Sequence, residues 1–300
     1  MTAADFEGLD APVVVGCSGG ADSLALLALA AAAELAPVAV YVDHGLRPPV
    51  DRAADLAAVR DAAARLGVGV DVVAAPVPAG PNLEARARRS RYRALEAARR
   101  RHGAGAVLVG HTADDQAETV LLALLRGSGV RGLAGMAARR GRLARPLLGL
   151  RRRDTERICR SAGLAWVHDA TNDDLRLRRN RVRHRALPEL AAVAERDLVP
   201  VLTRQARILR DEADFLDDLA ADLLRTAGIP HPATRVLADA PRPLARRAVR
   251  LWLGAPPPSA AEVERVLRVV EHVAVATELR GGRRIWRTQG RLRLSLASPA

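Results

Sequence analysis

The chain has 300 residues, enough for one large domain or two ordinary ones, and 49% of them are hydrophobic, enough to bury a substantial core. The 47 basic residues are all arginine and outnumber 34 acidic ones, and this net charge of +13 favours a polyanionic partner such as nucleic acid. The absence of lysine excludes a Walker A loop, and with it P-loop kinases and GTPases, because that loop uses a lysine to reach the phosphates.

Cysteine usage and hydropathy indicate the compartment. The two cysteines, Cys17 and Cys159, form neither a C-x-x-C pair nor a metal-ligand spacing, which suits a reducing environment. No apolar run reaches the roughly 18 uncharged residues that a membrane span requires. The first ten residues are acidic and lack the basic start of a signal peptide. We therefore expect a cytoplasmic protein with no membrane partner.

Strands and helices alternate in the first half of the chain. Short apolar runs predict strands at residues 13–15, 38–42, 68–73 and 106–109, and apolar periodicity predicts helices at 22–35, 51–66, 83–101 and 114–125. This alternation is typical of an α/β fold, a doubly wound parallel sheet covered by helices on both faces. Such sheets bind ligands at the carboxyl ends of their strands.

The pattern changes in the second half. We expect helices at 153–162, 178–190, 190–226, 244–253 and 260–272, and a terminal hairpin at 283–296. The predicted organisation is an α/β domain at residues 1–194 and a smaller, mainly helical domain at 195–300.

The stretch SGGADS follows the first predicted strand and opens the first helix. Gly19 and Gly20 allow a tight turn and close approach of a ligand to the backbone. Free N–H groups and the helix dipole favour an anion there, and the Ser18 and Ser23 hydroxyls add donors. Asp22 is a candidate Mg²⁺ ligand, because this ion binds through one or two carboxylates together with phosphate oxygens.

Four further stretches carry clustered polar residues: VDHGLR from Val42, NLEARARRSRY from Asn82, GHTADDQAET from Gly110, and DATNDDLRLRRNRVRHR from Asp169. The first and third begin at strand ends. Each has a purely structural interpretation as well. Asp114 and Asp115 could simply cap a helix, His44 and His111 could be structural histidines, and the arginine-rich segments could be solvated helix faces.

In this order, the five stretches resemble the tRNA(Ile)-lysidine synthetase family of PP-loop ATP pyrophosphatases, in a short form without a further C-terminal domain. The resemblance covers residues 13–190 and departs from the family where Thr112 replaces the second histidine of G-H-H, so we assign Thr112 no catalytic role. It implies a ligase for tRNA modification. ATP adenylates the wobble cytidine of isoleucine tRNA with a CAU anticodon, and free L-lysine displaces AMP to give lysidine after pyrophosphate has left. The modified tRNA then reads AUA as isoleucine instead of AUG as methionine.

The resemblance also implies site residues. Catalytic candidates are Asp22, Asp114 and Asp115, and lysine-binding candidates are Asp43, Asp115 and Glu118. ATP-binding candidates are Ser18, Gly19, Gly20, Ala21, Asp22, Ser23, His44, Gly110 and His111. Candidates for tRNA binding, where arginine planes would stack on splayed bases, are Arg88, Arg91, Arg176, Arg178, Arg179, Arg181 and Arg183. We expect the 195–300 domain to contact tRNA as well. The oligomeric state stays open, with a homodimer as one candidate.

Two other readings remain at this point. A PP-loop tRNA thiolase or another PP-loop adenylating enzyme would share the nucleotide loop, although the cysteine spacing does not match a thiolase pair. The second alternative is a non-catalytic RNA-binding protein with a decayed nucleotide site. The intact SGGADS and DDQAET stretches argue against it.

Overall fold

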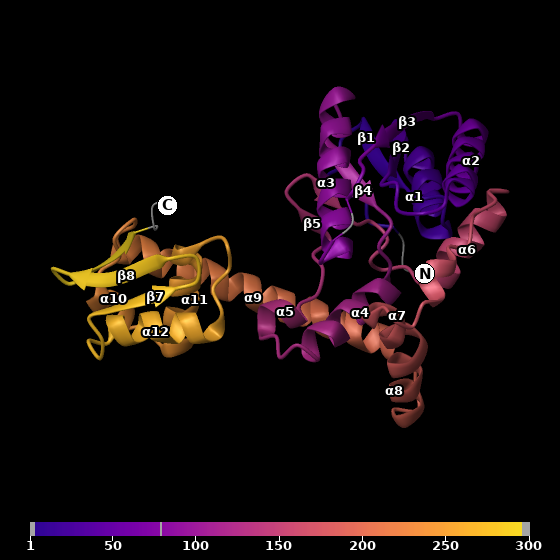
Figure 1. The fold of residues 1–300 in the computed structure, drawn as a ribbon. Helices are drawn as coiled ribbons and strands as arrows, with labels where there is room; N and C mark the ends of the chain where they lie inside the picture. The colour runs from indigo at the N-terminus through magenta and orange to yellow at the C-terminus, as the bar shows by residue number, and fades with distance from the viewer. Residues whose placement is uncertain (1–3, 79, 296–300) are drawn as a thin grey trace. The chain divides into compact units, whose positions relative to one another are not determined.

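The computed structural model describes residues 4–78 and 80–295 (Figure 1). The chain divides into two compact units, residues 1–207 and 208–300. The division lies inside helix α9 (Leu198–Ala227), whereas the sequence-based boundary at 194/195 precedes that helix. None of the described helices is long and apolar enough to cross a bilayer.

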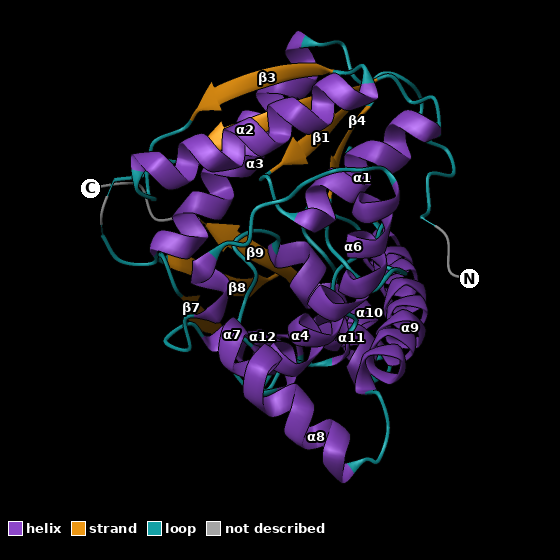
Figure 2. Ribbon diagram, turned by 90° about the vertical axis from the view of Figure 1, so that its right-hand side faces the viewer, coloured by secondary structure: helices purple, strands orange, loops and turns teal. Residues whose placement is uncertain are grey.

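The first unit is built on a six-stranded sheet with the order β3-β2-β1-β4-β6-β5. All neighbouring pairs are parallel except the edge pair β5–β6 (Figure 2, where β1 and β3 point the same way). The strands are β1 (Val13–Cys17), β2 (Pro37–Asp43), β3 (Gly69–Ala74), β4 (Ala106–Val109), β5 (Arg139–Arg140) and β6 (Leu143–Ala144). Chain order reverses at β1, which lies between β2 and β4. This is the position at which doubly wound sheets form a ligand crevice.

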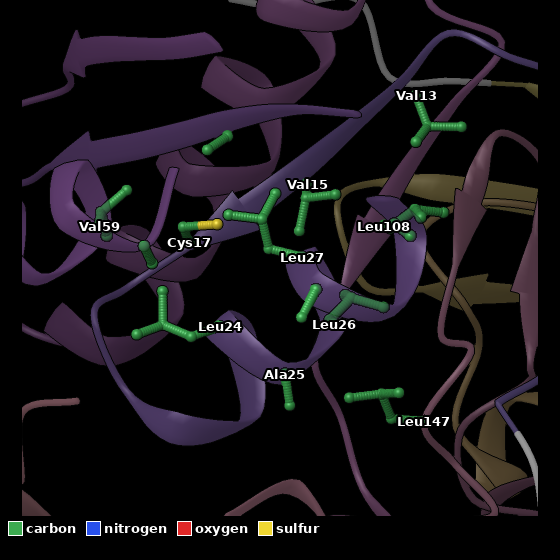
Figure 3. Packing of buried hydrophobic residues seen from close by; sticks show 14 of the residues in the cluster. Val13, Val15, Cys17, Leu24, Ala25, Leu26, Leu27, Val59, Leu108 and Leu147 are labelled. Atoms are coloured by element: carbon green, nitrogen blue, oxygen red, sulfur yellow. The ribbon is translucent and has the colours of Figure 1, made fainter. Parts of the chain in front are cut away.

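Helices cover both faces of this sheet, which confirms the predicted fold class. On one face, Val13, Val15 and Cys17 of β1 pack with α1 (Ala21–Ala32) and α2 (Pro49–Leu66) (Figure 3). Helix α6 (Arg152–Ser161) belongs to the same apolar cluster. On the other, Val14 packs with α3 (Leu83–Arg101). The alternation along β1 follows from the period of two in a strand, and a continuous apolar run is what a strand buried on both faces requires.

The first unit contains several further helical segments. They are α4 (Ala113–Leu124), α5 (Val130–Leu133), the 3₁₀ turn Ala170–Asp173, α7 (Arg178–Arg181) and α8 (Leu187–Val193), with a π-helical segment at Val182–Ala186 between the last two. The prediction of unbroken helix from 190 to 226 is wrong. Glu195 adopts φ +51°, which ends α8, and the Asp197 carboxylate accepts the Val199 N–H at 3.0 Å before α9 continues.

The second unit has its own apolar core, formed by the end of α9, three helices and a sheet. The helices are α10 (Thr234–Ala238), α11 (Arg242–Leu253) and α12 (Ala260–Val270). The antiparallel sheet β7-β8-β9 consists of Ala276–Leu279, Arg283–Thr288 and Arg291–Ser295. The predicted hairpin is confirmed as β8–β9, apart from residue 296, which lies outside the described residues. Strand β7 was not predicted.

Candidate active site

The SGGADS stretch forms the turn between β1 and α1. The Ser23 hydroxyl accepts the Ser18 N–H at 3.1 Å and donates to the Gly20 carbonyl at 2.9 Å, so a side chain closes the turn. Gly19 has φ +83°, and a Cβ there would lie 2.8 Å from the Asp55 carbonyl oxygen. Glycine at this position is therefore required both by conformation and by space.

The turn after β4 contacts the same place. A Cβ on Gly110 would lie 2.7 Å from the carbonyl oxygen of Asp22, in the first turn of α1. The two loops at the carboxyl ends of β1 and β4 thus meet backbone to backbone. Both loops carry residues predicted to bind ATP, and they lie together because β1 and β4 are neighbours in the sheet.

Asp22 faces α6. Its Oδ1 accepts a hydrogen bond of 2.5 Å from the Thr155 hydroxyl, and its Oδ2 lies 3.4 Å from Nε of Arg152. Burial raises the pKa of the Asp22 carboxyl, and the Thr155 bond and the Arg152 charge offset part of that increase. Neither partner was predicted. In the sequence, both residues lie in the RRRDT stretch that opens α6, and the apolar periodicity of that stretch indicates only the start of a helix.

Asp114 and Asp115 both lie in the first turn of α4 and both bind arginine, but only Asp115 caps the helix. Asp115 completes a capping box with Thr112, whose N–H donates to Asp115 Oδ2 at 2.9 Å. Its Oδ1 also accepts from Arg152 at 3.1 Å and from Arg179 at 3.0 Å. Burial by itself would raise the pKa of Asp115, but these two guanidinium groups outweigh it and lower the pKa.

Asp114 turns toward the start of α6. Arg151 Nη2 donates to its Oδ1 at 3.0 Å, and the Arg152 backbone N–H donates to its Oδ2 at 2.8 Å. Arg151 also pairs with Asp197. Asp114 therefore fixes the backbone of Arg152, and the Arg152 side chain reaches both Asp22 and Asp115.

Glu118 lies one turn further along α4 and is fully buried. Its two oxygens accept hydrogen bonds from Nε of Arg179 and Nε of Arg183, each at 2.6 Å. We call the connected set the acid–arginine cluster. It comprises Asp22, Asp114, Asp115, Glu118, Arg151, Arg152, Arg179 and Arg183.

A cavity of about 220 Å³ opens beside this cluster. Glu118, Asp114 and Asp197 contribute carboxylates to its lining, Arg151, Arg152 and Arg183 contribute guanidinium groups, and Leu187 and Val199 are among its apolar residues. Such a lining matches a ligand with an aliphatic chain and charged ends. Asp197 was not predicted, because its approach depends on the break between α8 and α9.

The two predicted histidines each have a buried ring nitrogen without a hydrogen-bond partner in the described part of the chain. These atoms are Nε2 of His44, whose Nδ1 lies 3.0 Å from the Ala75 carbonyl, and Nδ1 of His111. Burial lowers the pKa of His111 to about 3, so its ring is neutral at physiological pH. A neutral nitrogen left unpaired in a binding crevice is available to a ligand.

Asp43 stands apart from the acid–arginine cluster. It follows β2 and accepts the Gly45 N–H at 2.8 Å and Arg52 Nη1 at 2.5 Å. The Gly45 hydrogen bond, with Arg52, lowers the pKa of this carboxyl despite partial burial. Among residues 4–78 and 80–295, no recorded hydrogen bond or ion pair joins Asp43 to Asp115 or Glu118.

The predicted tRNA-binding arginines fall into two groups. Arg179 and Arg183 lie inside the acid–arginine cluster, with side chains 28% and 19% exposed. The exposed members are Arg88 and Arg91 on α3, and Arg176, Arg178 and Arg181 at and before α7. Arg176 pairs with Asp174 at 2.9 Å, and Arg181 donates to the Leu175 carbonyl at 3.0 Å.

Both cysteines are buried free thiols. Burial raises the pKa of Cys17 to about 12 and that of Cys159 to about 11. Neither forms the thiolate that nucleophilic sulfur chemistry requires near neutral pH.

Comparison with known proteins agrees with this geometry. Residues 7–190 match the family model described as a PP-loop domain. A U34-tRNA thiolase from Methanococcus maripaludis shares the fold with a TM-score of 0.55 and 18% identity, over 69% of this chain and 76% of that one. The fold and the SGGADS turn define the chain as a PP-loop protein.

Curated relatives identify the family within the PP-loop proteins. The chain is 46% identical over 277 residues to the tRNA(Ile)-lysidine synthase of Nocardia farcinica, which covers 90% of this chain and 84% of the relative. It is 42% identical over 291 residues to that of Mycolicibacterium paratuberculosis, covering 95% and 84%. The chain belongs to the tRNA(Ile)-lysidine synthase family, which consists of ATP-dependent ligases.

Proposed function

We propose that this protein joins the ε-amine of free L-lysine to C2 of the wobble cytidine in isoleucine tRNA with a CAU anticodon. The observation that supports this most directly is the meeting of the SGGADS turn with a buried acid–arginine cluster at the switch point of the sheet. The first element suits an ATP phosphate chain, and the second suits a charged acceptor.

The proposed reaction has two steps. The 2-carbonyl oxygen of the cytidine attacks the α-phosphorus of ATP, and the bond to the β-phosphate breaks to release pyrophosphate. The lysine amine then attacks C2, loses a proton, and AMP departs with the former carbonyl oxygen. Ser18, Gly19, Gly20, Ala21 and Ser23 would hold the phosphates through N–H and hydroxyl groups, and His44, Gly110 and His111 would line the nucleotide side.

Mg²⁺ fits this site only together with ATP. The described residues contain no group of three His, Cys, Asp or Glu side chains that could hold a metal by themselves. Asp22 offers Oδ2, whose 3.4 Å contact with Arg152 is long, and phosphate oxygens would complete the coordination. The ion would neutralise charge on the departing pyrophosphate.

Lysine would enter as a cation, and we propose that it lies in the 220 Å³ cavity. The apolar lining suits its methylene groups, and Glu118 suits its ammonium group, with Asp115 behind it in the acid–arginine cluster. Because arginines already neutralise both carboxylates, lysine would have to displace an arginine or share its partner. Asp43 remains a lysine-binding candidate on the β2 side, and Asp114 would act by holding Arg151 and Arg152 in place.

We also propose that the exposed arginines Arg88, Arg91, Arg176, Arg178 and Arg181 contact the tRNA, with the second unit contributing further contacts. A thiolase reaction is disfavoured because both thiols are buried and protonated. Cytoplasmic location and a homodimer remain hypotheses.

The deciding experiment supplies ATP, Mg²⁺ and radiolabelled lysine with isoleucine tRNA carrying CAU, or with the same tRNA carrying U at the wobble position. Label that survives alkaline deacylation only with CAU is the expected result, since an aminoacyl ester would be hydrolysed. Absence of stable label from both RNAs, with intact ATP binding, would overturn the proposal. Alternative sulfur and ammonia donors would then be tested.

A further inference from the structure

Arg145 immediately follows β6 and is only 7% exposed. Its Nη1 donates to the Ala137 carbonyl at 2.7 Å, and the Tyr92 hydroxyl is a second hydrogen-bond partner. Its Nε is buried and has no partner among the described residues. Since β6 neighbours β4 in parallel register, Arg145 lies at the same carboxyl edge as His111.

The surroundings of Arg145 add positive charge. The Arg88 guanidinium lies 5.1 Å from the centre of the Tyr92 ring, and the charges of Arg88 and Arg140 both act on Arg145. The charges of Arg145 and Arg88 also reach His111. None of the ion pairs recorded for residues 4–78 and 80–295 includes Arg145. The four arginines of the acid–arginine cluster, by contrast, each pair with at least one carboxylate.

A buried guanidinium without a counterion is costly, because the charge has left water and gained no opposite charge in return. The cost is recovered when an anion occupies the space next to it. Arginine presents its N–H groups as a planar fork that matches phosphate. The free Nε, the basic surroundings and the position at the sheet edge all indicate the same kind of ligand.

We propose that Arg145, with Arg88 and Tyr92, forms a phosphate-binding site at the carboxyl edge of β6. We call it the Arg145 site. The phosphate is a phosphodiester of the RNA next to the target cytidine, because the ATP phosphates belong at the β1 turn, two strands away in the sheet. Tyr92 with Arg88 over its ring offers a stacking surface for an adjacent base. The RNA source rests on the proposed function, whereas the phosphate chemistry does not.

The test measures binding without turnover. We compare wild type with Arg145→Met, Arg145→Lys and Arg88→Ala, using isoleucine tRNA carrying CAU and, separately, a non-hydrolysable ATP analogue with Mg²⁺. Arg145→Met should weaken tRNA binding roughly tenfold or more and reduce the slope of log Kd against log salt by about one. Arg145→Lys should keep the slope and lose part of the affinity. Binding of the ATP analogue should change less than about twofold.

Arg60→Met is the matched control, since Arg60 is an exposed arginine on α2, on the opposite face of the sheet. Arg88→Ala changes an exposed side chain and tests the same site if Arg145→Met unfolds. If Arg145→Met lost binding of the ATP analogue but not of tRNA, Arg145 would bind a phosphate of the nucleotide, and the assignment to RNA would be overturned. Unchanged binding of both ligands in Arg145→Lys and Arg88→Ala would overturn the proposal. A wild type that incorporates no lysine, yet binds tRNA through Arg145, would refute only the proposed function.

Discussion

Two buried glutamates, one in each unit, are neutralised in different ways. Glu118 in α4 is fully buried and pairs with the side chains of Arg179 and Arg183. Glu262 in α12 is 2% exposed and accepts the backbone N–H groups of Ser259 at 2.7 Å and Arg280 at 2.9 Å, and the exposed Arg280 guanidinium pairs with it at 3.2 Å. Those backbone hydrogen bonds hold the pKa of Glu262 well below its usual range.

The difference separates a structural carboxylate from one able to take part in chemistry. Backbone donors are fixed by the fold, so the Ser259 and Arg280 N–H groups hold Glu262 in place as a helix cap with a tether to the β7–β8 turn, whatever the Arg280 side chain does. Arginine donors belong to side chains with many rotamers, so Glu118 would be able to exchange partners under the proposal that lysine enters the cavity beside it. Asp22 and the Oδ1 atom of Asp115 share this dependence on side-chain donors.

The largest effect should come from Asp22→Ala. It removes the carboxylate nearest the nucleotide turn, so lysine incorporation into tRNA should fall at least about a hundredfold. The Kd for tRNA should remain within about twofold. Incorporation of radiolabelled lysine and filter binding measure the two quantities, with Asp61→Ala on the exposed side of α2 as control. Turnover close to wild type would show that Asp22 takes no part in the reaction. It would also contradict the inference that carboxylates bound by side-chain donors are the ones that act in the chemistry.

An intermediate effect should come from the paired variants Glu118→Gln and Glu262→Gln. Both lose charge-assisted hydrogen bonds and should lower the free energy of unfolding, by roughly 1–3 kcal/mol for Glu262→Gln. Only Glu118→Gln should also lower kcat per folded molecule, by about tenfold or more, because Arg179 and Arg183 lose their anchor. Urea unfolding and steady-state kinetics on the same preparations separate stability from turnover. Equal kcat in the two variants would contradict the inference that Glu118 takes part in the reaction and Glu262 does not.

The smallest effect concerns His111 and pH. Its folded pKa of about 3 lies below the usual 6.5, so between these values the unfolded chain binds a proton that the folded chain does not. Stability should therefore fall as pH drops below 6.5, by up to about 1.4 kcal/mol per pH unit, and should not change from this source above pH 7. Urea unfolding of wild type and His111→Gln from pH 8 to pH 4.5 measures this. Curves that stay parallel throughout would show that His111 is not buried neutral.

The sequence predicted the parallel sheet because four of its strands are apolar runs long enough to detect. It could not predict β5 and β6, which have two residues each and exist only through pairing with β4 and with each other. Arg145 escaped attention for that reason, since nothing local marks it as the end of a strand. The break at Glu195 was missed because a left-handed residue other than glycine or asparagine has no strong sequence signal.

The sequence named part of the candidate site, without Arg152, Thr155 and Asp197, and it named none of the pairings between side chains. The SGGADS turn, Gly110 and His111 lie together because strand ends of a parallel sheet share an edge. The pairing of Glu118 with Arg179 and Arg183 joins residues 61 and 65 positions apart, and depends on where α7 and the π-helical segment lie against α4. Spacing along one helix cannot reveal it. Arg152 and Thr155 became visible only when α6 packed on α1.

The contact between Gly110 and α1 has a mechanical consequence. A Cβ on Gly110 would lie only 2.7 Å from the Asp22 carbonyl oxygen, so the turn after β4 packs directly against the backbone of the nucleotide turn. No side chain lies between them to absorb a shift. A displacement of the SGGADS turn as a nucleotide enters would pass straight to His111, one residue beyond Gly110. Nucleotide binding at the SGGADS turn and the position of His111 after β4 would therefore be coupled by direct backbone contact, without a hinge.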